Sequence, residues 1–119
     1  MIVKIEAYIR EDKMEDVIDG LAAIDIHGIT CYQVMGCGSQ HGVKEYTRGK
    51  QEVELHLLPK IKIEVLLSTE KCEQRVIDTI QKAAYTGEKG DGKILSYDVR
   101  SAMRIRTHET GPEAIQPSD

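Results

Sequence analysis

The sequence contains no phenylalanine and no tryptophan, so its hydrophobic core must be aliphatic, with five tyrosines as the aromatic side chains. No apolar run approaches the ~20 residues of a membrane-spanning helix. The first strand-like stretch, residues 2–10, alternates too regularly to be a signal peptide. Cysteine is scarce: Cys31, Cys37 and Cys72 are odd in number and form no C-x-x-C pair, which favours a reducing setting over a disulfide framework. We therefore expect a cytoplasmic protein.

The remaining composition is that of a globular protein. A length of 119 residues predicts a single domain over residues 1–119 with one core. Hydrophobic residues make up 40% and charged residues 30% of the chain, which is ordinary for a globular domain. The formal net charge of −4 argues against nucleic acid as the main partner, because a phosphate backbone requires a basic surface.

Two stretches alternate apolar and polar residues with the period of two that predicts a half-buried β-strand. Their apolar sides are formed by Ile5, Ala7 and Ile9 in residues 2–10, and by Ile61, Ile63 and Val65 in residues 59–68. Shorter patterns predict further strands over residues 27–38, 90–99 and 102–108.

Two segments show the apolar spacing of amphipathic helices. The first, residues 11–26, is acidic at its start, where the helix dipole favours negative charge. The second, residues 69–85, has Ser68 or Thr69 as a candidate N-cap and Gly87 as a C-terminal stop.

The order strand, helix, strand, long loop, strand, helix, strand is a doubled βαβ unit. It predicts an α+β, ferredoxin-like fold, in which a four-stranded antiparallel sheet carries two helices on one face. The long connection over residues 39–58 has no clean period, and such a stretch inside a compact domain is usually functional or mobile. An RNA-binding domain of this architecture would need sheet aromatics to stack bases, and the absent phenylalanine and negative charge argue against it.

The segment TGEKGDGKIL, residues 86–95, matches the G-x-x-x-x-G-K opening of a phosphate-binding loop. A nucleotide hydrolase needs Ser or Thr after the lysine to hold Mg²⁺, and here Ile94 follows Lys93. The predicted helix also precedes the glycines instead of following them, so we reject a hydrolase P-loop. Successive glycine N–H groups can still form an anion-binding nest, with added charge from the lysine. A flexible helix-to-strand connection is the alternative.

Two arginines strengthen the phosphate interpretation. Arg104 and Arg106 are two apart in the predicted strand 102–108, which would direct both guanidinium groups from one face, about 7 Å apart. Two forked cations on one face suit phosphate oxygens. The alternative is an edge strand protected by charge.

Signs of a catalytic centre are weak, and we expect no enzymatic activity. No nucleophile stands beside a base, and no carboxylates are paired in one motif. Asp91 is more typical of an Asx-type turn residue than of a base. Cys37 lies between two glycines, but nothing in the sequence indicates the lowered pKa of a reactive thiol. The four histidines show no metal-ligand spacing.

Taken together, five segments resemble the PII signal-transduction family, the nitrogen-regulatory proteins of the GlnB/GlnK type. They are GCGSQHG (36–42), TRG (47–49), LPKIKIEV (58–65), TGEKGDGKI (86–94) and IRTHETGPEAI (105–115). The resemblance covers almost the whole chain. It implies a homotrimer of ferredoxin-like subunits with ATP or ADP bound in the clefts between neighbours. The implied functional loops are a T-loop (about 37–56), a nucleotide-binding B-loop (about 85–93) and a C-terminal loop (about 105–119).

The resemblance also implies roles for individual residues. Thr30 and Glu64 would line the adenine and ribose, while Arg104 and Arg106 would clamp the phosphates. The full nucleotide-binding set is Thr30, Gly36, Gly38, Ser39, Gln40, Glu64, Gly87, Gly90, Asp91, Gly92, Lys93, Arg104 and Arg106.

A second ligand, 2-oxoglutarate, is implied at Gln40, Lys60 and Gly90, bound through a Mg²⁺ ion shared with ATP. Gln40 would be the metal's only protein ligand, because the hard Mg²⁺ ion can take its other oxygens from phosphate, 2-oxoglutarate and water. Ser39 stands where the family often carries a basic residue, so one phosphate contact is missing. An adenine-nucleotide sensor of the same fold that responds to a different metabolite is the alternative.

The T-loop would bind the partner. Its candidate contact residues are Lys44, Tyr46, Arg48 and Lys50. In the GlnK branch the partner is an ammonium transporter blocked by a loop arginine, for which Arg48 is the candidate, so membrane association would be peripheral. The position of the uridylylated tyrosine is taken by Glu52 or Val53, and we expect no uridylylation at that site.

Overall fold

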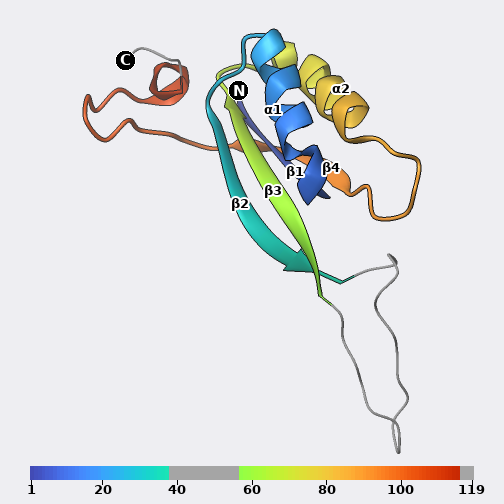
Figure 1. The fold of residues 1–119 in the computed structure, drawn as a ribbon. Helices are drawn as coiled ribbons and strands as arrows, with labels where there is room; N and C mark the ends of the chain where they lie inside the picture. Colours follow the sequence, from blue (N-terminus) through green and yellow to red (C-terminus); the bar gives the residue numbers. More distant parts are fainter. Residues whose placement is uncertain (38–56, 116–119) are drawn as a thin grey trace, which may run out of the picture.

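The structure is a computed structural model that describes residues 1–37 and 57–115 (Figure 1). In chain order, its strands and helices are β1 (Ile2–Arg10), α1 (Met14–Ala23), β2 (Ile29–Gly36), β3 (Leu58–Leu67), α2 (Glu73–Ala84) and β4 (Lys93–Val99). Within the described residues they are accompanied by short 3-10 turns, η1 (Glu11–Lys13), η2 (Glu70–Cys72) and η3 (Gly111–Ala114). This order confirms the predicted doubled βαβ unit.

The strands of the described part of the chain form a four-stranded antiparallel sheet in the order β2-β3-β1-β4. Both helices cover the same face of this sheet (Figure 1). β1 is central, because it pairs with β3 along one side and with β4 along the other. The α+β, ferredoxin-like architecture expected from the sequence is therefore confirmed.

The core lies between the sheet and the two helices and is entirely aliphatic. Its buried side chains include Ile5, Ala7 and Ile9 from β1, Ile61, Ile63 and Val65 from β3, Val17 and Leu21 from α1, and Val76 and Ile80 from α2. β-Branched valine and isoleucine fit a pleated, covered surface well. A chain without phenylalanine or tryptophan thus fills its core through strict alternation on the two central strands.

Helix α2 leads directly into the glycine-rich segment. The Thr69 hydroxyl accepts a hydrogen bond from the Lys71 N–H at 3.2 Å and caps the turn before α2. The helix ends at Ala84, and the chain then becomes extended at Tyr85. The segment therefore follows a helix and precedes β4, the reverse of a hydrolase P-loop. None of the helices within residues 1–37 and 57–115 is long and apolar enough to cross a membrane.

The predicted strand over residues 102–108 is wrong. Met103 forms only an isolated bridge with Thr110, and the chain turns between them. The turn closes locally, because the Arg104 N–H donates to the Glu109 carbonyl and the His108 N–H donates to the Arg104 carbonyl. We call residues 100–115 the C-terminal arm; it leaves the end of β4 and extends away from the sheet (Figure 1).

We predict that the buried β3 contacts dominate stability. Ile63 is fully buried between sheet and helices, so Ile63→Ala should lower the free energy of unfolding by about 2–5 kcal/mol and Ile63→Val by about 1 kcal/mol. Urea unfolding at a fixed protein concentration measures both. Equal losses for the two variants would contradict a tightly packed aliphatic core at this position.

Candidate functional site

A cavity of about 380 Å³ opens at the end of the sheet where β2 ends and where β3 and β4 begin. It is lined by Tyr8, Val34, Met35, Gly36, Cys37, Leu58, Lys60, Gly90, Gly92 and Lys93. Five of these residues, Gly36, Lys60, Gly90, Gly92 and Lys93, were predicted as site residues from separate parts of the sequence. The cavity thus joins the end of β2, the start of β3 and the glycine loop, which we define as residues 85–92.

The register of the sheet explains why these segments meet. Lys60 on β3 lies opposite Val34 on β2 and opposite Arg10 on β1. On the other side of β1, Lys93 at the start of β4 lies opposite Tyr8. Because neighbouring strands are only about 4.8 Å apart, pairing at one end of the sheet brings residues from four strands around one opening.

Gly92 brings the loop against the backbone of β1. Its φ is +101°, a left-handed conformation that side chains disfavour. A Cβ atom at this position would lie 1.7 Å from the carbonyl oxygen of Tyr8. The loop can therefore enter β4 along this path only if residue 92 is glycine, which gives this glycine a packing role in addition to its place in the cavity wall.

The Asp91 carboxylate closes the glycine loop from inside. It accepts hydrogen bonds from the Thr86 N–H at 2.8 Å, the Gly87 N–H at 2.9 Å and the Thr86 hydroxyl. The Thr86 hydroxyl and then the Thr86 N–H, helped by Gly87 and Arg10, hold the pKa of Asp91 far below its usual range. Asp91 is thus an ionised acceptor within the loop. The Gly87 amide, predicted to face a phosphate, donates to Asp91 in this structure.

Two cations on neighbouring strands hold the next part of the loop. The Arg10 guanidinium donates from Nε to the Asp91 carboxylate at 3.1 Å and from Nη2 to the Lys89 carbonyl at 2.7 Å. The Lys60 ammonium donates to the Gly90 carbonyl at 2.6 Å. Burial, followed by the nearby Arg10 charge, lowers the pKa of Lys60. With Lys93 in the wall, this end of the sheet gathers three cationic side chains.

Arg104 and Arg106 lie on the C-terminal arm and are not brought to this cavity within one chain. β4 starts beside Tyr8 with Lys93 and ends beside Ile2 with Val99, so the arm leaves from the opposite end of the sheet. Figure 1 shows the arm and the glycine loop on opposite sides of the sheet. Arg104 forms an ion pair with Glu109 at 3.2 Å. Because the arm is no strand here, the predicted shared strand face of the two arginines is also wrong.

Thr30 and Glu64 lie opposite each other on β2 and β3 but do not line the cavity. Glu64 accepts a hydrogen bond from the Tyr32 hydroxyl and pairs with Lys4 at 3.2 Å and with Lys62 at 3.5 Å, on the sheet face away from the helices. The Tyr32 hydrogen bond is the main cause that lowers the pKa of Glu64. Glu64 is therefore held as a carboxylate within a charge network.

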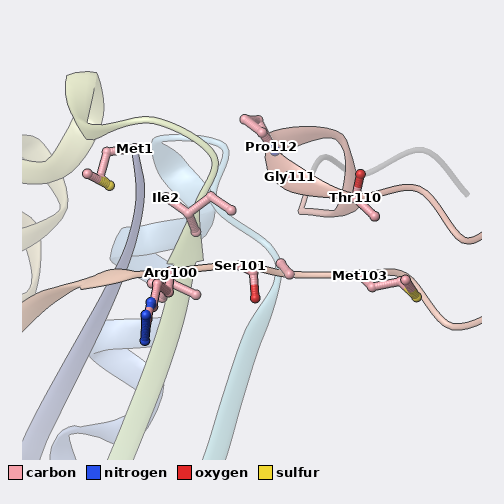
Figure 2. Close-up of a pocket in the computed structure, with 10 residues that line it drawn as sticks. Met1, Ile2, Arg100, Ser101, Met103, Thr110, Gly111 and Pro112 are labelled. Atoms are coloured by element: carbon pink, nitrogen blue, oxygen red, sulfur yellow. The ribbon is translucent and has the colours of Figure 1, made fainter.

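A second cavity, of about 490 Å³, lies between the start of β1 and the C-terminal arm (Figure 2). Met1 and Ile2 form one side, while Ser101, Met103 and the turn around Gly111 form the other (Figure 2). Among the described residues of its lining, Arg100 is the one charged side chain. It is larger than the cavity at the glycine loop, but none of the predicted site residues that the structure describes lines it.

Seven predicted site residues, Gly38, Ser39, Gln40, Lys44, Tyr46, Arg48 and Lys50, lie outside the described residues. Within residues 1–37 and 57–115, no group of three or more His, Cys, Asp or Glu side chains could hold a metal ion. Sequence reasoning missed Tyr8 and Arg10. Arg10 contacts Asp91 across 81 positions, so no local pattern in the sequence signalled it.

The structure is thus a ferredoxin-like domain in which a glycine loop and cationic side chains surround a cavity at one end of the sheet. A family model described as Nitrogen regulatory protein P-II matches residues 2–109. The chain belongs to this P-II family of nitrogen-regulatory signal-transduction proteins.

Individual relatives agree with this assignment. The chain is 45% identical over 112 residues to nitrogen regulatory protein P-II 1 of Methanothermobacter thermautotrophicus, covering 94% of this chain and 96% of the relative. It is 42% identical over 107 residues to GlnK of Escherichia coli, covering 90% and 94%. The crystal structure of Arabidopsis thaliana PII bound to citrate has a TM-score of 0.76 at 32% identity, covering 95% and 91%. The structure of B. subtilis GlnK has a TM-score of 0.76 at 33% identity, covering 95% and 97%.

We predict that Gly92→Ala disrupts the loop. The added methyl group would meet the Tyr8 carbonyl and require a disfavoured φ, so the free energy of unfolding should fall by at least about 3 kcal/mol. Gly28→Ala is the matched control, because an added Cβ there has no neighbour within 4 Å. Urea unfolding compares the two. Similar small effects would contradict the close approach at Gly92.

The hydrogen bonds that Asp91 accepts predict that the free energy of unfolding depends on pH. The pKa of Asp91 is lower in the folded state than in the unfolded state, where it is about 3.8. The ionised carboxylate therefore stabilises the fold fully above pH 3.8, and this contribution to the free energy of unfolding is lost as the pH falls from there towards the folded-state pKa. Asp91→Asn should cost about 2 kcal/mol at pH 7 and less at pH 3. Asp98→Asn, at an exposed position on β4, is the control. Urea unfolding at both pH values measures the differences, and an unchanged cost at pH 3 would contradict this role.

Proposed function

We propose that the protein is a cytoplasmic, non-enzymatic sensor that binds ATP or ADP and, together with Mg²⁺–ATP, 2-oxoglutarate. The observation that carries this proposal is the convergence of Gly90, Gly92, Lys93 and Lys60 on one cavity. Glycine lets a phosphate approach the backbone without meeting a side chain, and the two lysines supply positive charge. The net charge of −4 makes such a local gathering of cations selective for small anions over nucleic acid.

The nucleotide site would be completed between subunits. Arg104 and Arg106 leave the opposite end of the sheet from the glycine loop, so one chain does not bring its own arginines to its own phosphates. A neighbouring copy could supply them, which supports a site shared between chains, and the family resemblance implies a homotrimer with nucleotide in each cleft. Thr30 and Glu64, away from the cavity, would contact the adenosine part of the same ligand.

A carboxylate effector fits the end of β3. The Lys60 ammonium bonds to the Gly90 carbonyl beside the cavity, where a dicarboxylate could compete for it. The solved Arabidopsis thaliana relative is bound to citrate, a small carboxylate. Gln40 would hold the Mg²⁺ ion together with ligand oxygens, and the ion would supply positive charge to offset that of the two anions.

The regulatory output would come from the T-loop. Ligand binding would shift the populations of the T-loop conformations. The size of this shift is limited by the difference between the ligand's affinities for those conformations. Lys44, Tyr46, Arg48 and Lys50 would then contact a nitrogen-metabolism partner such as an ammonium transporter, so that the protein meets a membrane only through its partner. A second candidate function, an adenine-nucleotide sensor of the same fold that answers a different metabolite, is supported by Ser39, which replaces the family's frequent basic residue.

Calorimetric titration tests the proposal. ATP and ADP are added separately, and 2-oxoglutarate is then added with and without Mg²⁺–ATP. We expect both nucleotides to bind and 2-oxoglutarate to bind only with Mg²⁺–ATP. Lys60→Ala should weaken 2-oxoglutarate about 10- to 100-fold, because it removes a charge-assisted contact. Lys71→Ala, an exposed lysine of η2, is the matched control.

Three results would separate the hypotheses. Binding of nucleotide without any 2-oxoglutarate binding would favour the second candidate. Absence of nucleotide binding by the wild-type protein would overturn the proposal. An equal loss for Lys60→Ala and Lys71→Ala would show that general charge, not the Lys60 position, attracts the effector.

A further inference from the structure

Arg10 is anchored on the sheet and reaches into the glycine loop. It is the last residue of β1 and lies opposite Lys60 on β3, so its backbone is fixed by the central strand. Its side chain is about one-fifth exposed and spans 81 positions to meet Asp91 at 3.1 Å. The same guanidinium donates to the Lys89 carbonyl at 2.7 Å. One rigid element thus holds two points of a loop that is otherwise mostly exposed.

The two contacts of Arg10 bracket Gly90, which lines the cavity. Gly87, Gly90 and Gly92 all have positive φ, and glycine leaves this conformation at little cost unless something else fixes the chain. Asp91 in turn holds the N–H groups of Thr86 and Gly87. Arg10 therefore fixes Asp91, and Asp91 fixes the first turn of the loop.

The ion pair between Arg10 and Asp91 also matters for the binding of an anionic ligand. Asp91 lies between two residues of the cavity wall, and its carboxylate would repel an incoming phosphate if nothing neutralised it. The Arg10 guanidinium places a permanent positive charge beside that carboxylate. A guanidinium also offers donors in a fork, which suits two separate acceptors, whereas a lysine ammonium is a point charge on a flexible stem.

We infer that Arg10 is a positioning residue for the phosphate site: it acts through Asp91 and the Lys89 carbonyl to keep the glycine loop in its binding shape. This inference rests on the proposed nucleotide function of the same cavity. It differs from a direct contact, because it requires the effect of Arg10 on phosphate affinity to depend on Asp91.

The test measures ATP and inorganic triphosphate binding by calorimetry for the wild type, Arg10→Gln, Arg10→Lys, Asp91→Asn and the Arg10→Gln/Asp91→Asn double variant. Triphosphate isolates the phosphate contribution, because it lacks adenine and ribose. We expect Arg10→Gln to weaken both ligands about tenfold and Arg10→Lys to restore part of this loss. In the Asp91→Asn background, Arg10→Gln should weaken binding further by at most about twofold, because only the bond from Arg10 to the Lys89 carbonyl is left to lose. Arg75→Gln, an exposed arginine on α2, is the control for lost charge.

Hydrogen exchange on the ligand-free variants gives an independent measurement. Arg10→Gln should speed exchange of the Thr86 and Gly87 amides, which donate to Asp91, while the buried β3 amides stay protected. Wild-type-like affinity for Arg10→Gln, or a full tenfold loss in the Asp91→Asn background, would overturn the inference. If the wild type binds neither ATP nor triphosphate, the proposed function fails, and unchanged exchange at Thr86 and Gly87 would then overturn the role of Arg10 separately.

Discussion

The close contact between the glycine loop and the backbone of β1 is the constraint on which the site depends. Gly92 passes so near the Tyr8 carbonyl that a methyl group cannot fit, and Lys93 begins β4 directly beside it. This contact fixes where the loop ends. Arg10 lies two residues further along β1, and Lys60 is its partner on β3. Their backbones are fixed by the sheet, and their side chains donate hydrogen bonds to the loop. The cavity is therefore built from the central strand outwards.

The distribution of charge separates this site from the rest of the sheet. On the face away from the helices, Lys4 and Lys62 are matched by Glu6 and Glu64, whose pKa values are lowered by hydrogen bonds from Tyr97 and Tyr32, respectively. Positive and negative groups compensate one another there. At the cavity end, within the part of the chain that the structure describes, Lys60 and Arg10 donate to backbone carbonyls of the glycine loop, and Arg10 also pairs with the Asp91 carboxylate. The cations of this end therefore hold the backbone of a loop, whereas those of the sheet face hold side-chain carboxylates.

The sequence allowed the architecture to be predicted, because alternation and helical spacing are local signals that the aliphatic core preserves. It also located the glycine loop and Lys60. The strand predicted over 102–108 failed, because the turn at His108 satisfies the backbone locally and an alternating pattern does not encode that turn. Arg10 was missed for a different reason. Its partner Asp91 is distant in the chain, and only the register of β1 with β3 and β4 brings them together.

Asp91 has a consequence for the kinetics of recognition. Its carboxylate already occupies the N–H groups of Thr86 and Gly87, so the first turn of the loop forms during folding, with an internal anion in place of an external one. The entropy of ordering this turn is therefore lost once, when the chain folds, and not at every encounter with a ligand. An anion that binds such a preorganised loop would not wait for a conformational search, and differences in affinity among ligands would then be expressed mainly in their dissociation rates.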